Sequence, residues 1–177
     1  MKLLSAILLL LTVIVSSVYA SVSDVKADLS KVAALVTKLD KTITNFPADG
    51  GTISDGIAIN NDVTALGQGL DKATQNVKAI PPFSNSDSIT TVGSAKVFSP
   101  TIVHLLNGVV EKKSSIGKIN FPGIFDLVRG ALQDLGTKGN ALGNALAESS
   151  TGPAKSQAQA IQAELRVAFE KAVKAYS

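Results

Sequence analysis

The stretch VKADLSKVAALVTKLDKTITNF, residues 25–46, decides the fold class of this 177-residue chain. Its apolar residues recur in steps of four and three without a gap: Val25, Leu29, Val32, Val36, Leu39, Ile43 and Phe46. Such steps place side chains on one face of an α-helix, as in a coiled-coil seam. Ser21 and Asp24 form a capping-box pattern before this stretch, and Pro47 marks its end. The stretch therefore predicts one long helix with a continuous apolar face.

The same spacing returns in three later parts of the chain. Residues 52–80 begin with a capping-box pattern at Thr52 and stop before Pro81. Residues 121–146 and 153–176 carry two further apolar faces, separated by a Thr-Gly-Pro break. At about 1.5 Å per residue these segments are similar in length to the first helix or slightly shorter. Helices of matched length joined by short loops predict an up-and-down bundle.

Residues 84–110 leave two interpretations open. Apolar residues continue at helical spacing on both sides of Pro100. Ser99 as N-cap, with Pro100 at the first helical position, would begin a new helix. One continuous helix kinked at Pro100 fits the same pattern. The sequence therefore predicts an all-α, up-down bundle of four to five long antiparallel helices, kinked or broken at Pro100.

The first twenty residues have the features of a secretory signal peptide. Lys2 precedes an apolar run over residues 3–15. Val18 and Ala20 are small residues that suit a cleavage site between Ala20 and Ser21. The run is shorter than the roughly 20 apolar residues that a membrane-spanning helix needs. We therefore expect residues 1–20 to be removed on secretion. The mature chain is then one extracellular domain, residues 21–177, without a transmembrane segment.

Few residues are suited to catalysis or metal binding. The chain has no cysteine and one histidine, His104. His104 lies about 200° around its helix from the apolar residue Ile102, so we expect it on the solvated surface. No Gly-x-Ser-x-Gly turn and no Glu-x-x-His pattern occurs. Aromatic residues make up only 5% of the chain, too few for a stacking groove for nucleic acid. The sequence therefore predicts a protein without enzymatic activity, metal site, cofactor or nucleic-acid partner.

Glycines interrupt the predicted helices at many positions. They are Gly67, Gly69, Gly93, Gly108, Gly130, Gly136, Gly139 and Gly143. Each costs about 1 kcal/mol relative to alanine, in domains whose net stability is about 5–15 kcal/mol. One explanation is close approach of neighbouring helices, and the other is a deformable bundle with room for an acyl chain. The sequence leaves both explanations open.

Four short stretches, taken in order, resemble a known family. They are DLSKVAALV (residues 28–36), LGQGLDKAT (66–74), VEKK (110–113) and FPG (121–123). Together with the Ala-rich last helix, they make the chain similar to the hydrophobic surface-binding protein A family. This family includes the fungal cell wall mannoprotein and galactomannoprotein antigens.

The resemblance implies a secreted or cell-wall-associated fungal protein without catalytic residues. Its expected partners are hydrophobic surfaces or fatty-acid-like lipids, together with a secreted cutinase-like polyesterase that such proteins help to recruit. The candidate ligand-binding residues lie on the apolar faces of the second helix and of the helix after residue 121: Leu66, Leu70, Val128, Leu132 and Leu135. Two alternatives remain open. One is a structural wall protein without a ligand, and the other is a helical inhibitor or recruiter of a secreted enzyme.

Overall fold

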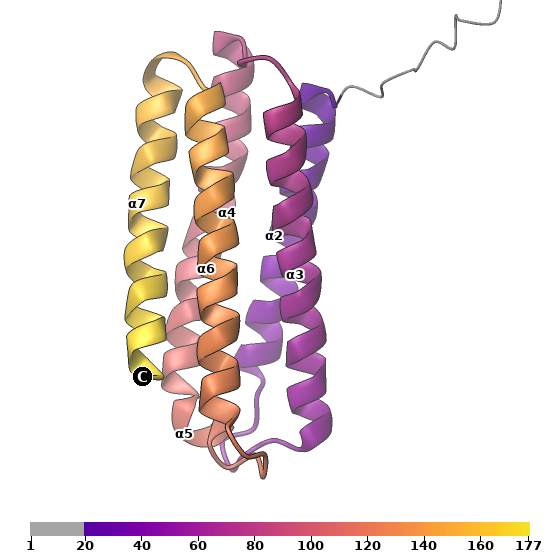
Figure 1. Cartoon of the computed structure of the whole chain (residues 1–177), viewed down its shortest axis with the longest axis vertical. Coiled ribbons are helices and arrows are strands. Elements are labelled where there is room, and N and C mark those ends of the chain that lie inside the picture. The colour runs from indigo at the N-terminus through magenta and orange to yellow at the C-terminus, as the bar shows by residue number, and fades with distance from the viewer. Residues whose placement is uncertain (1–19) are drawn as a thin grey trace, which may run out of the picture.

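The computed structural model describes residues 20–177, which form five long helices and one short helix (Figure 1). The long helices are α2 (Val22–Thr44), α3 (Ile53–Ala79), α4 (Asn85–Glu111), α6 (Ile124–Ser149) and α7 (Gly152–Ala175), and α5 (Lys113–Ile116) is a single turn. The described part contains no strand, so the predicted all-α fold is confirmed. The predicted signal peptide lies almost wholly outside the described residues.

Two helices begin at the capping boxes that the sequence predicted. The Ser21 hydroxyl accepts a hydrogen bond from the Asp24 amide at 3.2 Å, and the Asp24 carboxylate accepts one from the Ser21 amide at 2.8 Å. Thr52 and Asp55 form the same reciprocal pair at the start of α3. The Ser21 hydroxyl and amide also lower the pKa of the Asp24 carboxyl, because both donate to its charged form.

Pro100 does not break α4, which runs continuously from residue 85 to residue 111. Proline has no N–H, so the Lys96 carbonyl one turn earlier loses its usual helical donor. The buried Ser99 hydroxyl donates to this carbonyl at 3.2 Å. Ser99 is therefore not the N-cap of a new helix, as one of the two interpretations had it. Residues 85–111 form a full-length helix without a break at Pro100. This helix is the fifth long helix of the bundle.

The five long helices are arranged in a closed ring. The packed neighbours, in order around the ring, are α2, α3, α6, α7 and α4, and α4 packs again on α2. Successive helices run in opposite directions, so the described chain starts at one end of the bundle and finishes at the other (Figure 1). A ring with an odd number of helices cannot be antiparallel throughout. Accordingly, α3 and α6 lie parallel, as do α4 and α7, and α2 and α4.

The main hydrophobic core lies inside this ring. The apolar residues that recur along α2 are all at most 3% exposed, which confirms the predicted apolar face of this helix: Val25, Leu29, Val32, Val36, Leu39 and Ile43. None of the described helices is both long enough and apolar enough to cross a membrane.

Candidate functional site: an apolar cavity inside the helix ring

Five helices packed in a ring leave space at the centre of the ring. With neighbouring axes about 9 Å apart, each axis lies about 8 Å from the centre of the ring, while a helix with its side chains has a radius of about 5–6 Å. The space left over has about the width of an acyl chain, unless large side chains fill it. The number of helices in the ring therefore creates the potential for a central cavity.

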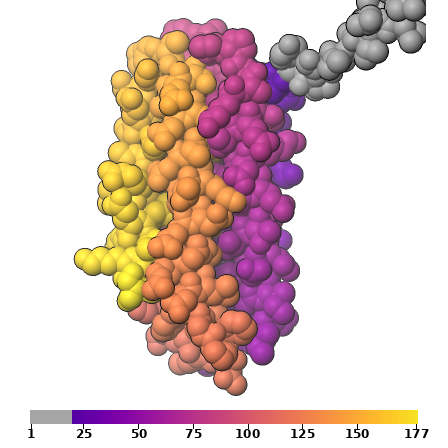
Figure 2. All heavy atoms as spheres, viewed as in Figure 1, coloured from indigo at the N-terminus to yellow at the C-terminus, as the bar shows by residue number. Residues whose placement is uncertain are grey.

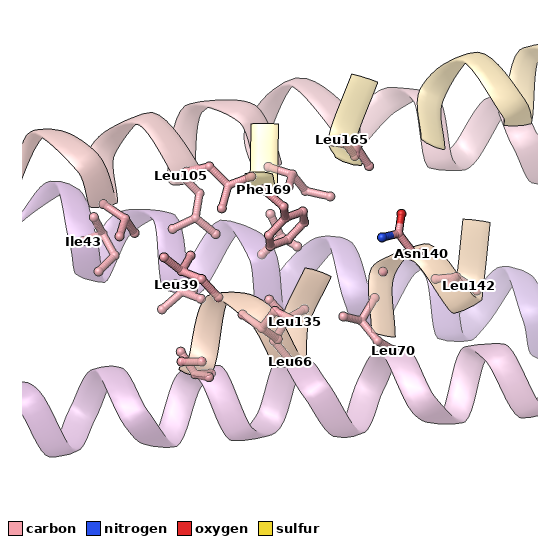
Figure 3. Close-up of a pocket in the computed structure, with 18 of the residues that line it drawn as sticks. Leu39, Ile43, Leu66, Leu70, Leu105, Leu135, Asn140, Leu142, Leu165 and Phe169 are labelled. Atoms are coloured by element: carbon pink, nitrogen blue, oxygen red, sulfur yellow. The ribbon is translucent and has the colours of Figure 1, made fainter. Parts of the chain in front are cut away.

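The structure contains such a cavity, with a volume of about 150 Å³, and all five long helices line it. Leucine and isoleucine side chains converge on it from α2, α3, α4 and α6, and Phe169 reaches it from α7 (Figure 3). In the space-filling view, α6 lies between α7 and α3 along this face of the bundle (Figure 2). The side chains of these helices cover the cavity on that side.

All five residues selected from the sequence line this cavity. Leu66, Leu70, Leu132 and Leu135 are buried, and Val128 is half-buried. Their position is thus established, whereas their contact with a ligand stays a prediction.

Sequence reasoning missed the lining residues on three helices. Leu39 and Ile43 come from α2, Leu105 from α4, and Leu165 and Phe169 from α7. Periodicity marks these residues as facing the interior, but it cannot show which interior residues border a hollow.

No charged side chain lines the cavity. The polar side chains in its wall are the amides of Asn60, Asn140 and Gln162. His104 lies outside it, with 65% of its side chain exposed, as the sequence predicted. Its Nδ1 lies 2.6 Å from the Asp40 carboxylate, and this hydrogen bond raises the pKa of His104. Within the described residues no group of three or more potential metal ligands occurs.

The glycines of α6 confirm close approach of neighbouring helices and border the cavity, whereas a bundle that deforms for an acyl chain stays a prediction. A Cβ atom at Gly143 would lie 2.9 Å from Cγ of Gln162, and one at Gly136 would lie 3.4 Å from the Phe169 ring. These two glycines therefore allow α7 to approach α6 closely. Gly139 and Gly143 also line the cavity, which their missing side chains widen. Gly130 has no atom within 4 Å of such a Cβ, so packing does not explain it.

The size of the cavity sets what it can hold without rearrangement. A dry apolar cavity of about 150 Å³ accepts a molecule the size of benzene, so a long acyl chain requires the helices to separate further. Of the five long helices, α7 has the smallest buried side chains, which are three alanines: Ala154, Ala158 and Ala172. Its larger apolar residues Ile161, Leu165 and Phe169 are only half-buried, although they face the cavity.

Together, the ring and its lining define a class of protein: a helical bundle that encloses an apolar cavity. A family model for hydrophobic surface binding protein A matches residues 22–148, and the chain belongs to this family. The match covers α2 to α5 and nearly all of α6. No curated protein sequence matches the chain.

Solved structures of similar proteins carry lipids. The chain is similar to Afmp4p in complex with palmitic acid, with 25% identity and a TM-score of 0.82 over 89% of this chain and 100% of that one. It also has the fold of ligand-binding domain 1 of the Penicillium marneffei MP1 protein, complexed with arachidonic acids. That match has 20% identity and a TM-score of 0.78 over 89% of this chain and 99% of that one. Domain 2 of the same protein, complexed with multiple arachidonic acids, matches with 16% identity and a TM-score of 0.78 over 89% and 96% of the two chains.

Proposed function

We propose that this protein is a secreted, non-enzymatic lipid-binding protein that holds an acyl chain in its central cavity. The observation that carries the proposal is a hollow lined from five helices by aliphatic and aromatic side chains, without a charged group. Such a lining stabilises an alkyl chain by burying it and offers no reactive group to transform it. The palmitic and arachidonic acids in the similar structures support the same ligand class.

Chain length provides the direct test. Each methylene group buried in an apolar site contributes about 0.8 kcal/mol, so two further carbons should tighten binding roughly tenfold until the cavity is full. Delipidated protein is titrated with saturated fatty acids of increasing length, by displacement of a fluorescent lipid. Native mass spectrometry of protein recovered from the culture medium then identifies the lipid bound in vivo. An affinity independent of chain length would contradict binding inside the cavity and favour the structural wall protein without a ligand.

A second candidate function is adsorption to hydrophobic surfaces, which exposed apolar side chains at one end of the bundle support. Ile53, Ile57, Phe121 and Leu127 are about half exposed and belong to the starts of α3 and α6 and the loop before α6. Because α3 and α6 run parallel, these apolar residues lie at the same end of the bundle (Figure 1). The double variant I57S/L127S should adsorb less to a hydrophobic sensor, whereas V97S on α4, away from this end, serves as the matched control. Equal adsorption of all three proteins would remove this candidate.

Secretion, wall association and recruitment of a polyesterase complete the proposal. Secretion is supported by the composition of residues 1–20, and N-terminal sequencing of protein from the medium should begin at Ser21.

Recruitment is tested by adding the protein to a cutinase on a polyester film. The proposal expects faster hydrolysis on the film and an unchanged rate on a soluble ester. Slower hydrolysis of both substrates would instead indicate an inhibitor.

A further inference from the structure

Polar groups gather at one place in the wall of the cavity. Asn140 on α6 and Gln162 on α7 both line it, and these two helices pack together. Asn144 lies one turn after Asn140 on the same face of α6. In the view of Figure 3 the Asn140 amide lies between Leu165 and Leu70, close to Leu142. Asn140 and Gln162 line the cavity, whereas Asn144 is exposed and contacts Gln162. We call Asn140, Asn144 and Gln162 the amide cluster.

Two contacts hold the Gln162 side chain in the amide cluster. Its Nε2 donates a hydrogen bond to Oδ1 of Asn144 at 2.7 Å. Its aliphatic part lies over Gly143, where a Cβ atom would come within 2.9 Å of its Cγ. The glycine therefore leaves the space in which Gln162 lies against α6. Gln162 retains one N–H and its carbonyl oxygen for another partner.

Asn140, by contrast, has no hydrogen-bond partner among the described residues and is only partly exposed. It offers two N–H donors and a carbonyl acceptor beside the apolar lining. A half-buried amide with open donors gains most from a ligand that supplies a polar atom at that point.

The basic residues nearest to the amide cluster along α6 and α7 are paired with carboxylates. On α6, Lys138 contacts Asp71 at 2.9 Å and Asp134 at 3.3 Å. On α7, Arg166 contacts Glu170 at 2.8 Å. The cluster itself therefore offers amide hydrogen bonds, and the basic residues nearest to it along α6 and α7 are engaged with carboxylates.

We propose that the amide cluster is a head-group subsite, which binds the oxygen atoms of a single-chain lipid with either a carboxyl or a hydroxyl head. This inference rests on the proposed function, because it places the ligand in the same cavity. From Asn140 the lining continues along α6 through Leu135, Leu132 and Val128 to Ile124. This path is about 24 Å long at 1.5 Å per residue, so it has the length for a long acyl chain once the helices separate. Since the subsite relies on amides, a fatty alcohol binds there as a fatty acid does.

The test compares three ligands that share a sixteen-carbon chain: palmitic acid, hexadecanol and hexadecane. Full-length protein, wild type and variants, is delipidated, and the affinities are measured by displacement of a fluorescent lipid. N140L and Q162L each remove hydrogen bonds worth about threefold to tenfold in affinity. We expect this loss for both the acid and the alcohol, and no loss for hexadecane. Q133L adds the same apolar bulk at an exposed site on α6 and is the matched control.

The outcomes separate the subsite from the proposed function. Wild-type protein that binds none of the three lipids would overturn both. Tight binding by wild type with unchanged affinities in N140L and Q162L would overturn the subsite alone. A loss confined to palmitic acid would also overturn it, because the amides would then bind only the charged carboxylate and not both head groups. Urea midpoints identify variants that do not fold, and N140A, which adds no bulk, then replaces N140L.

Discussion

The Tyr176 hydroxyl donates a hydrogen bond to the backbone carbonyl of Val109 at 2.8 Å. Val109 lies in the last turn of α4, whose final carbonyls have no helical donor further along the chain. The residue that follows α7 therefore completes the end of α4, its parallel neighbour in the ring. Burial raises the pKa of the Tyr176 phenol, so the hydroxyl remains a donor throughout the physiological range.

Tyr176→Phe should lower the free energy of unfolding by about 1–3 kcal/mol, because the Val109 carbonyl would stay buried without its partner. Urea unfolding followed by circular dichroism measures the change. Thr137→Val is the control, since it removes an exposed hydroxyl that only bonds to the backbone of its own helix, and should change stability by less than about 0.5 kcal/mol. A change of similar size in both variants would contradict the interhelical role of Tyr176.

The pair formed by His104 and Asp40 predicts a pH dependence with a defined sign. The folded state raises the pKa of His104 above its ordinary value of 6.5 through the hydrogen bond to Asp40. The pair therefore stabilises the fold fully below pH 6.5 and loses this effect as the pH rises through the raised folded pKa. Unfolding midpoints from pH 5 to 9 should fall more steeply for wild type than for His104→Gln. Asp40→Asn should resemble His104→Gln, and a wild-type advantage that grows with pH would contradict the assignment.

Leu132→Trp distinguishes a cavity from a packed core. Leu132 is buried and lines the cavity, so a larger side chain there can occupy the hollow. We expect weaker binding of palmitic acid with only a small shift of the urea midpoint. Leu29→Trp is the control, because Leu29 is fully buried but does not line the cavity, and overpacking there should cost about 1–3 kcal/mol. If both variants lose the same stability and Leu132→Trp still binds palmitic acid as wild type does, Leu132 lies in an ordinary packed core.

Ser99 and Pro100 should be energetically coupled. Ser99→Ala leaves the Lys96 carbonyl without its hydroxyl donor and should cost about 0.5–1.5 kcal/mol. Pro100→Ala restores an N–H for the same carbonyl and should stabilise α4 by up to about 3 kcal/mol. In the Pro100→Ala background the serine becomes redundant, so a double-mutant cycle by urea unfolding should show a smaller cost for Ser99→Ala. Strictly additive effects would contradict this role for Ser99.

Two glycines of α6 should respond oppositely to alanine. Gly130→Ala meets no atom within 4 Å and should stabilise the helix by about 1 kcal/mol. Gly143→Ala would press on both Cβ and Cγ of Gln162, so the gain in helix propensity should be lost to displacement of α7. Thermal unfolding of both variants measures the contrast. Stabilisation of both by the same amount would show that α6 and α7 do not pack closely at Gly143.

By itself, the sequence determined four of the five long helices and the inward-facing side of each, while the form of α4 stayed open. The steps of four and three from Val25 to Ile43 and the capping boxes at Ser21 and Thr52 act within a few residues, so local rules suffice to identify them. The same rules selected Leu66, Leu70, Val128, Leu132 and Leu135 as interior residues, because they lie on apolar faces.

Only the tertiary structure decided that these faces surround a hollow. Whether a buried leucine meets another side chain or empty space depends on how many helices close the ring and how they are ordered around it, and neither is encoded in the period of one helix. The continuity of α4 depended on a hydroxyl that replaces one missing N–H. The amide cluster depended on α7 packing against α6, which brings Gln162 into hydrogen-bond contact with Asn144. The apolar period within one helix does not show which residues of another helix it meets.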